Sequence, residues 1–547
     1  MKKFCEWWRA EAGYAMERRY VTLIKSLLLG ILPLVCCLVY CGVQGRSLGE
    51  VYPPCSEWND ELFYYKQVEG IVNYGYPQGY FGFNESHALK LSFAAWSPVL
   101  VFPWILWGLV FGWNLMSPML CNIALMTLCC ILFVWLVRPT WKQTGILSLL
   151  FCLYRPFVRY MLSVMPEIIC FSMLIVFYGL AVNYLRREKA YKLVLLFLMS
   201  GVMTLMRPYL LLFMLLPAWF WFRRSRWKGA AGSLAVIGAV VGLYACIKHY
   251  LGAEYFAPLF FTDWVTAFFE QGLFGGIRYT AGKLYYMGKD FWGHTLQGLR
   301  TGLASGAFFA GFLVCTGVLA GQSAADLYKI RRDRKRAAEA AQGERPKNVL
   351  VHIEAHLAFS CVAMFFALLL MYKLTEGSKH LLTFMAAAVF VISLMETRFY
   401  KKAVLVGVAF AYLYSYMAVN PYDYQVPFVQ EDRKADVERW QELLGERLSL
   451  EEESPSYENV VIWVFQDKVD GVATIVDWQL LYALPEAFGI SCCEPEYVKE
   501  NFDELKSRYL FTAAAGEIDA LCAQAGFEKV GEAGGMVLYQ RFSEPDR

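Results

Sequence analysis

The sequence is poor in charged residues, which make up 18% of its 547 positions. A soluble globular chain carries about 25%. Instead, 57% of the residues are hydrophobic and 17% are aromatic, and the mean hydropathy is +0.37. The apolar residues gather in blocks close to the ~20 residues that span a bilayer. Because lipid offers the backbone no hydrogen-bond partners, such blocks must be helices. The composition therefore excludes an ordinary soluble protein and predicts a polytopic membrane protein.

Several other signals are missing as well. No Cys-x-x-Cys pair or His/Cys spacing indicates a metal site. We find no internal repeat, and no glycine-rich phosphate loop on the side expected to be cytoplasmic. The first apolar block, 21–41, follows a basic segment and lacks a small-residue cleavage site, which favours an uncleaved anchor. Most of the sixteen cysteines lie in apolar blocks. Four cysteines are expected on the outer side: Cys55, Cys492, Cys493 and Cys522. The sequence leaves open whether two of them form a disulfide, and it cannot assign the pairing.

Basic clusters between the apolar blocks mark the cytoplasmic side. They occur at 2–19, 138–142, 186–192, 223–228, 329–347 and 398–402. The neighbouring blocks 93–113 and 117–137 cannot both span, because Arg138 would then lie outside. Block 93–113 contains Pro98 and Pro103, which are typical of a broken interfacial helix, so we expect it not to span.

This pattern predicts eleven crossings and three parts of the chain. The spans are expected at 21–43, 117–137, 144–164, 168–185, 193–207, 209–222, 230–250, 301–320, 350–372, 380–395 and 403–419. Residues 1–20 form a cytoplasmic segment, and 21–420 form the membrane domain with outer loops 44–115 and 252–300. Residues 421–547 form a small extracytoplasmic α/β domain, with helices at 432–450, 502–510 and 517–525 and strands at 460–465 and 536–540. The predicted fold class is thus an all-α polytopic membrane protein with a C-terminal α/β domain.

A pair of adjacent acids, Asp60 and Glu61, follows the first span, with Tyr64 and Tyr65 one helical turn later. Two carboxylates just outside a membrane suit a general base that acts on a hydroxyl acceptor. The alternative is that they only begin a helix, where acids are favoured in the first turn and Asn59 or Asp60 is a good N-cap. Both interpretations stay open at this point.

A third acid, Glu167, lies at the predicted outward turn between the third and fourth spans. A carboxylate at the membrane boundary costs free energy unless it is solvated or paired. Arg155 and Arg159 lie one turn apart in the outer half of the third span. They are candidates to pair with Glu167 or to meet an anionic lipid phosphate. The alternative is a structural ion pair and an arginine that reaches towards the interface.

Some basic residues lie at outer edges, against the positive-inside tendency: Arg207, Arg278, Lys283, Lys379 and His380. A phosphate leaving group needs such cations. Anchoring to lipid headgroups is the alternative, and it is favoured for Arg278 and Lys283.

The order and the side of these motifs resemble the GT-C superfamily of integral membrane glycosyltransferases, in the branch of protein O-mannosyltransferases and aminoarabinose transferases. The resemblance covers about residues 15–420. It rests on Asp60-Glu61 with Tyr64-Tyr65, Ala95-Trp96-Ser97-Pro98 with Phe111-Gly112-Trp113, Glu167, and Ser378-Lys379-His380-Leu381. The family's usual Lys-Pro-Pro is Trp96-Ser97-Pro98 here, and Lys379 stands where an arginine is commoner. The C-terminal domain matches no motif of the family.

The resemblance implies an inverting transfer of a sugar from a polyprenyl-phosphate sugar to a hydroxyl of a glycan, lipid or protein at the outer membrane face. Asp60 is the first choice for the base and Glu61 the second, with Glu167 in support. Arg159, Arg207, Lys379 and His380 are the expected donor-phosphate ligands, and Tyr64 and Tyr65 the expected substrate contacts. No nucleic-acid partner and no cofactor are expected. Carboxylates alone suffice to hold a divalent metal, but the pattern does not require one.

Three other hypotheses share these features. A transporter or flippase of a lipid-linked saccharide would need a path across the membrane rather than one outward hollow. A surface-polysaccharide polymerase or ligase would consume oligosaccharide diphosphate lipids. An assembly scaffold would use the C-terminal domain to bind a partner.

Overall fold

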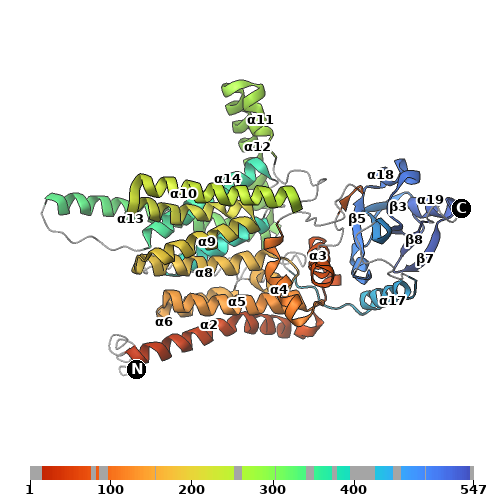
Figure 1. Cartoon of the computed structure of the whole chain (residues 1–547), viewed down its shortest axis with the longest axis horizontal. Coiled ribbons are helices and arrows are strands. Elements are labelled where there is room, and N and C mark those ends of the chain that lie inside the picture. The colour runs from red at the N-terminus through yellow and green to blue at the C-terminus, as the bar shows by residue number, and fades with distance from the viewer. Residues whose placement is uncertain are drawn as a thin grey trace.

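The computed structural model describes residues 15–75, 82–85, 97–153, 155–251, 261–301, 304–339, 350–372, 378–394, 425–447, 457–486 and 488–541. It consists of a long helical bundle and a sheet-containing domain, with helix α3 (Asp60–Tyr74) lying between them (Figure 1). The bundle contains α2 (Ala15–Val43), α5 (Ser117–Val137), α6 (Trp141–Leu153), α7 (Arg155–Met161), α8 (Glu167–Arg186), α9 (Ala190–Met206), α10 (Leu215–Leu251), α13 (Ala304–Glu339), α14 (Val351–Met371) and α15 (Ser378–Leu394).

Among the described residues, six helical segments are long and apolar enough to cross a membrane: Arg19–Val43, Ser117–Val137, Glu167–Arg186, Pro208–Leu251, Phe309–Arg332 and Val351–Met371. Shorter apolar helices accompany them at Phe102–Phe111, Ala190–Met206 and His380–Leu394. The predicted span 144–164 is divided between α6 and α7. The predicted span 403–419 lies outside the described residues.

Helix α10 is a pair of antiparallel helices rather than one rod. Arg226 has φ 45° and ψ −122°, far from helical values. A β-carbon added at Gly229 would lie 2.4 Å from the carbonyl oxygen of Trp221. In a straight helix, residues eight apart are ~12 Å from one another. The chain therefore reverses here, and glycine leaves room for the close approach. This reversal accounts for the two spans predicted at 209–222 and 230–250.

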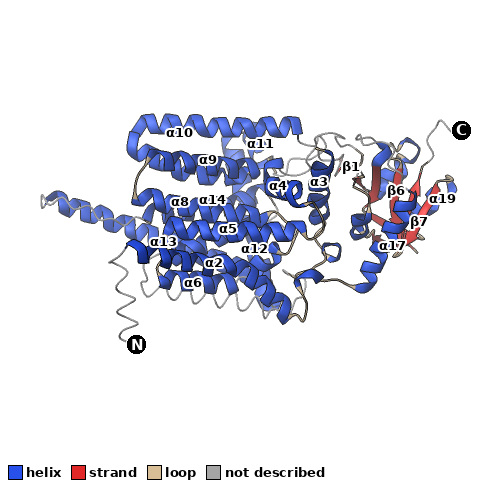
Figure 2. Cartoon of the chain, turned by 60° about the horizontal axis from the view of Figure 1, so that its bottom comes forward, coloured by secondary structure: helices blue, strands red, loops and turns tan. Residues whose placement is uncertain are grey.

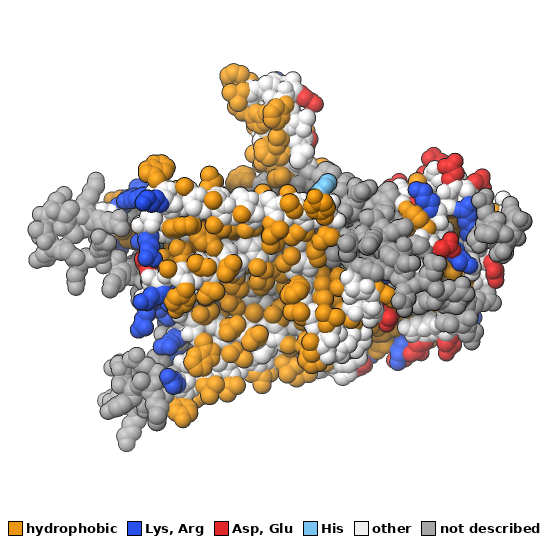
Figure 3. Space-filling view, in the orientation of Figure 1, with side chains coloured by type: hydrophobic (Ala, Val, Ile, Leu, Met, Phe, Trp, Pro, Cys, Tyr) orange, Lys and Arg blue, Asp and Glu red, His pale blue; other side chains and the backbone are white. Residues whose placement is uncertain are grey.

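The two ends of the bundle differ in charge. Lysine and arginine side chains gather at the end away from the sheet domain, which we call the basic end, and an apolar belt covers the middle (Figure 3). We call the other end, next to the sheet domain, the domain end. A belt of this kind suits lipid rather than water, because soluble proteins rarely expose large continuous apolar surfaces. The chain is an integral membrane protein, as predicted.

Helix α4 (Phe102–Phe111) has ten residues and is ~15 Å long, too short for a hydrocarbon core of ~30 Å. This agrees with the non-spanning helix expected at 93–113, of which 93–96 lie outside the described residues.

Helix α3 packs against α4. Its residues 61–70 are all buried, because the bundle lies on one side of it and the sheet domain on the other (Figures 1 and 2).

The C-terminal domain contains a six-stranded sheet in the order β1-β5-β2-β6-β8-β7. Its strands are β1 (Gly82–Phe83), β2 (Val460–Val464), β5 (Gly489–Cys493), β6 (Tyr509–Ala513), β7 (Glu528–Ala533) and β8 (Met536–Gln540), and a separate hairpin joins β3 (Gln466–Val469) to β4 (Val472–Ile475). Helices α17 (Glu431–Arg447), α18 (Pro495–Glu500) and α19 (Glu517–Gln524) cover the sheet (Figure 2). Strands β1, β5, β2 and β6 are parallel, and β2, β5 and β6 are fully buried, as parallel strands covered on both faces are.

The sheet confirms the predicted small α/β domain, but it contains more strands than the two predicted at 460–465 and 536–540. Residues 502–510 were expected to be a helix, but they form a short 3₁₀ turn, Phe502–Glu504, and then the start of β6, because Tyr509–Ala513 pairs with both β2 and β8. Strand β1 comes from the first outer loop, so the sheet includes a segment more than 300 residues away in the chain. The cysteines at 55, 492, 493 and 522 are free thiols.

Candidate active site

The two adjacent acids at the start of α3 have different environments. The side chain of Glu61 is 0% exposed, and its Oε1 accepts a hydrogen bond of 2.8 Å from Nη2 of Arg159 on α7. The same nitrogen donates to Oγ of Ser56 at 3.0 Å, and the guanidinium lies 3.8 Å from the centre of the Trp58 indole ring. Burial raises the pKa of Glu61, while the charge of Arg159 opposes that rise. Glu61 is therefore held in a buried ion pair.

Asp60 is half-buried at the first position of α3. The side chain of Asn59 makes no capping hydrogen bond, so Asn59 is not the conventional N-cap that the sequence suggested. Tyr64, one turn further along, is buried and lies within the electrostatic reach of Asp60, Glu167 and Arg207. Burial raises its pKa well above the ordinary value, and Arg207 opposes that rise. Tyr64 thus lies between the acid of α3 and the charges of the bundle.

A second buried ion pair joins α8 to the end of α9. Nη2 of Arg207 donates to Oε1 of Glu167 at 2.7 Å, with the two side chains 1% and 0% exposed. Nη1 of Arg207 donates to the hydroxyl of Tyr209 at 2.9 Å. The Tyr209 ring contacts the ring of His380 edge-on, with centroids 5.4 Å apart, and His380 also contacts Tyr372. Glu167, Arg207 and His380 therefore form one cluster through Tyr209.

Asn122 on α5 fixes the turn that precedes Glu167. Its Nδ2 donates to the carbonyl oxygen of Ser163 at 3.0 Å and also reaches the carbonyl oxygens of Tyr160 and Met161. Its Oδ1 accepts a hydrogen bond of 2.8 Å from the Trp104 indole of α4. The backbone N–H of Val164 in this turn points at Glu61 Oε2, 3.4 Å away. One fully buried amide therefore connects α4 and α5 to the turn between the two acid–arginine pairs.

The C-terminal domain closes over the same region. Nζ of Lys66, on α3, donates to Oε2 of Glu69 and to the carbonyl oxygen of Leu484, at 2.7 Å each. Tyr482, on the 3₁₀ helix η7 (Trp478–Ala483), lies 5.6 Å from the ring of Tyr65. Burial raises the pKa of Tyr482 far above its ordinary value, and the charge of Glu61 adds to that rise. Its buried hydroxyl has no hydrogen-bond partner among the described residues.

The first outer loop is also held by the domain. The buried carboxylate of Glu85 accepts hydrogen bonds from the backbone N–H groups of Lys506 and Ser507, at 3.0 and 2.6 Å to Oε1. The backbone N–H of Glu85 donates to Oγ of Ser491 at 3.1 Å, and its carbonyl oxygen accepts from the Tyr457 hydroxyl at 3.1 Å. The first outer loop is therefore bound to the C-terminal domain at two separate places, Lys66 and Glu85.

The structure brings together Asp60, Glu61, Tyr64, Tyr65, Arg159, Glu167, Arg207 and His380 at the domain end of the bundle. Of the roles that the sequence left open for Arg159, the structure does not show the pair with Glu167, because Arg159 binds Glu61 whereas Glu167 binds Arg207. The side chains of Arg155 and Lys379 lie outside the described residues. Arg278 and Lys283 are on α12 (Gly272–Thr301), away from this cluster (Figure 1).

Sequence reasoning missed Asn122, Tyr209, Ser56 and Tyr482. An asparagine within an apolar span is the one signal that could have indicated Asn122, since an amide in a membrane helix needs partners. Within the described residues no group of three or more His, Cys, Asp or Glu side chains is arranged to hold a metal ion. Nη1 of Arg159 and Oε2 of Glu167 are buried without a hydrogen-bond partner in the described part of the chain.

No protein-family model and no curated protein matches the sequence. The fold resembles solved structures, one of which is the archaeal oligosaccharyltransferase AglB from Archaeoglobus fulgidus, in complex with an inhibitory peptide and a dolichol-phosphate. It is 13% identical, with 90% of this chain and 69% of that chain covered and a TM-score of 0.48. Another is ArnT from Cupriavidus metallidurans bound to undecaprenyl phosphate, at 10% identity, 94% and 97% coverage and a TM-score of 0.40; its apo state gives 0.41. Both are GT-C membrane glycosyltransferases, the superfamily that the motifs resemble.

Proposed function

We propose that this protein transfers a sugar from a polyprenyl-phosphate sugar to an acceptor hydroxyl, at the membrane face on which the domain end lies. The observation that supports this proposal best is the meeting of acids and cations from distant segments. Glu61 and Arg159 are 98 residues apart in the chain, and Glu167 and Arg207 are 40 apart. A carboxylate base and cations for a phosphate are the two requirements of such a transfer.

The orientation follows from the basic end. Lysine and arginine side chains near span ends favour the cytoplasmic side. We therefore assign the basic end and the N-terminus to the cytoplasm, and the domain end and the C-terminal domain to the outer side. A lipid-linked donor would then reach the cluster from within the outer leaflet.

In the proposed reaction, Asp60 accepts the proton of the acceptor hydroxyl while the acceptor oxygen bonds to the anomeric carbon. The bond from that carbon to the phosphate oxygen breaks, and the electron pair leaves with the polyprenyl phosphate. Asp60 is preferred to Glu61 as the base because it is half-buried, whereas Glu61 is enclosed and bound to Arg159. Glu61 is then a positioning residue that fixes the start of α3.

The leaving phosphate needs positive charge. Lys379, His380 and Arg207 are proposed to supply it, with Glu167 holding the Arg207 guanidinium in place. Arg159 keeps its buried Nη1 without a hydrogen-bond partner among the described residues, and its guanidinium adds positive charge next to Asp60. Removal of one such electrostatic partner typically costs about 10²–10³ in rate.

The packing beneath the cluster favours an enzyme over a transporter. The side chains around α8 below Glu167 are apolar and tightly packed: Phe133, Phe171, Leu174, Ile175, Tyr178 and Phe390. A polar saccharide that crossed the membrane along α8 would have to displace this aromatic core.

The test supplies polyprenyl-phosphate monosaccharides to the purified protein and measures transfer. We expect Asp60→Asn to lose about 10²–10⁴ in rate, the usual contribution of a positioned base. Glu57→Gln, an exposed acid three residues earlier, is the matched control and should retain the wild-type rate. Full activity of Asp60→Asn would remove the assignment of the base. A protein that ignores monophosphate donors but consumes oligosaccharide diphosphate lipids would be a polymerase or ligase instead.

A further inference from the structure

Helices α11 (Asp263–Glu270) and α12 form a hairpin that projects sideways from the bundle, nearer to the domain end than to the basic end (Figure 1). The turn between them uses Gly272, whose φ of 71° suits glycine. The two helices approach closely because Gly276 has no side chain: a β-carbon there would lie 2.4 Å from the Phe268 ring. The hairpin is therefore a packed unit and not two loose helices.

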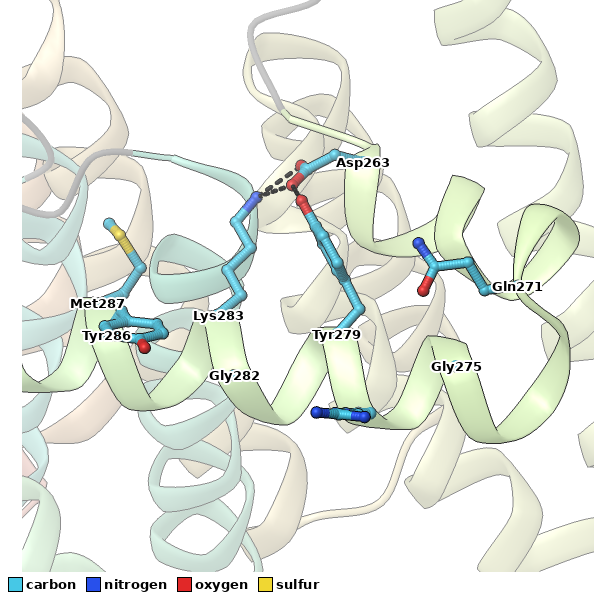
Figure 4. A pocket seen from close by; sticks show the side chains of 9 residues that line it. Asp263, Gln271, Gly275, Tyr279, Gly282, Lys283, Tyr286 and Met287 are labelled. Atoms are coloured by element: carbon cyan, nitrogen blue, oxygen red, sulfur yellow. Dashed lines mark hydrogen bonds and ion pairs between the residues drawn. The ribbon is translucent and has the colours of Figure 1, made fainter.

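Polar groups on one side of the hairpin bind one another. The carboxylate of Asp263, at the start of α11, accepts hydrogen bonds from Nζ of Lys283 at 2.5 and 2.7 Å and from the Tyr279 hydroxyl at 2.6 Å (Figure 4). These groups line an open pocket of about 500 Å³ along α12. Lys283 is thus bound within the hairpin, which differs from the free headgroup anchor that the sequence suggested.

The opposite side of the hairpin carries large apolar side chains with no protein against them in the described structure. Phe269 is 85% exposed, Phe274 86% and Leu273 65%. Ile277 lies one turn after Leu273 and is also exposed. At 100° per residue, Leu273, Phe274 and Ile277 share one face of α12, while Asp290 lies on the opposite face. The hairpin is therefore strongly amphipathic.

This apolar face has a definite direction. Hydrophobic side chains lie on the side of the hairpin that faces the basic end, and acidic side chains lie on the side that faces the sheet domain (Figure 3). The apolar face therefore points along the bundle towards the basic end, in the direction of the apolar belt. Arg278 and Lys289 both lie next to one edge of this face on the helical wheel, where phosphate headgroups would meet them.

We propose that the α11–α12 hairpin lies flat in the bilayer leaflet at the domain end, with Phe269, Leu273, Phe274 and Ile277 among the acyl chains and the Asp263–Lys283 side towards water. The bilayer itself covers the apolar face, because this face continues the lipid-facing surface of the bundle. Amphipathic helices of this kind bury their apolar face about 5–10 Å into the boundary between headgroups and acyl chains. The hairpin extends the membrane footprint of the protein sideways, next to the end at which the candidate site lies.

The experiment places a genetically encoded fluorescent amino acid at Phe274 or Ile277, and at Asp290 as the matched control on the opposite face of the same helix. Each full-length variant is reconstituted into nanodiscs of phosphatidylcholine with or without brominated acyl chains. We expect bromine to quench the label at Phe274 and Ile277 but not at Asp290. Aqueous iodide should give the reverse order. This readout does not depend on any enzymatic activity.

Two outcomes would overturn the proposal. Iodide quenching at all three positions would place the hairpin in water. Protection of Phe274 and Ile277 from both quenchers would mean that another protein surface, such as a second copy of the chain, covers the apolar face. Circular dichroism of each variant in the nanodisc, compared with the wild type, identifies a label that has unfolded the helix. If the label at Phe274 or Ile277 does so, the other of these two positions supplies the result.

Discussion

Removal of the Arg159 guanidinium by Arg159→Met should destabilise the protein strongly while keeping most of the side chain's volume. The variant leaves the Glu61 carboxylate in a fully enclosed site without its cation, and it also removes the hydrogen bond to Ser56 and the stacking on Trp58. Breaking a buried pair by removal of one partner costs about 3–5 kcal/mol. Thermal unfolding of the purified protein in detergent should therefore show a clearly lower Tm at neutral pH.

The stability lost in Arg159→Met should depend on pH, and the pKa of Glu61 determines the direction of that dependence. Burial raises the pKa of Glu61 even beside Arg159, so the folded protein holds this proton more tightly than the unfolded chain does. The stability that this proton contributes is present at low pH and is lost as the pH rises through the folded-state pKa. Without Arg159 to oppose the effect of burial, that pKa rises further. The Tm of Arg159→Met should therefore be close to that of the wild type in acid and should drop below it as the pH rises towards neutral.

A double variant separates the charge from the packing. In Glu61→Leu/Arg159→Met no buried charge remains, and apolar replacements of buried ion pairs are often neutral or stabilising. The double variant should thus recover much of the stability that the single variant loses, with little dependence on pH in this range. An Arg159→Met protein with the wild-type Tm at neutral pH, or a double variant no better than the single one, would refute the buried-pair explanation.

Three further changes test other contacts. Asn122→Leu leaves the Trp104 indole and the Ser163 carbonyl oxygen unpaired and should cost about 1–3 kcal/mol for each group left unsatisfied, seen as a lower Tm. Glu85→Ala removes the acceptor of two backbone N–H groups, so hydrogen exchange at 506–507 should accelerate while the bundle stays protected. Gly276→Leu should force α11 away from α12 at a cost of about 1–3 kcal/mol, seen as faster exchange in α11, and unchanged exchange would count against the packed hairpin.

The spans could be predicted from sequence because a membrane helix satisfies its own backbone hydrogen bonds. The apolar segment alone therefore determines where such a helix begins and ends. Helix α5 matches the prediction at both ends, Ser117 and Val137. For the predicted span at 144–164, α6 ends at Leu153 and α7 begins at Arg155, and the residue between them lies outside the described residues, so a single span there stays a prediction.

The C-terminal domain shows the opposite case. The strand at 536–540 and the helix at 517–525 were predicted within one residue, since each has a clear local pattern. Residues 502–510 were not, because the strand that begins at Tyr509 is selected by its neighbours β2 and β8 and not by its own preference. The contribution of Gly82–Phe83 to the same sheet has no local pattern at all, since two residues cannot show a period.

By itself the sequence determined the membrane architecture, the separate C-terminal domain and the positions of acids and cations along the chain, because hydropathy and charge act on each segment independently. Only the tertiary structure decided which cation meets which acid. Arg159 binds Glu61 and Arg207 binds Glu167 because helix packing makes them neighbours, and no spacing in the chain encodes that choice. The same packing encloses Glu61 and leaves Asp60 half-buried, which separates two adjacent carboxylates that the sequence could not tell apart.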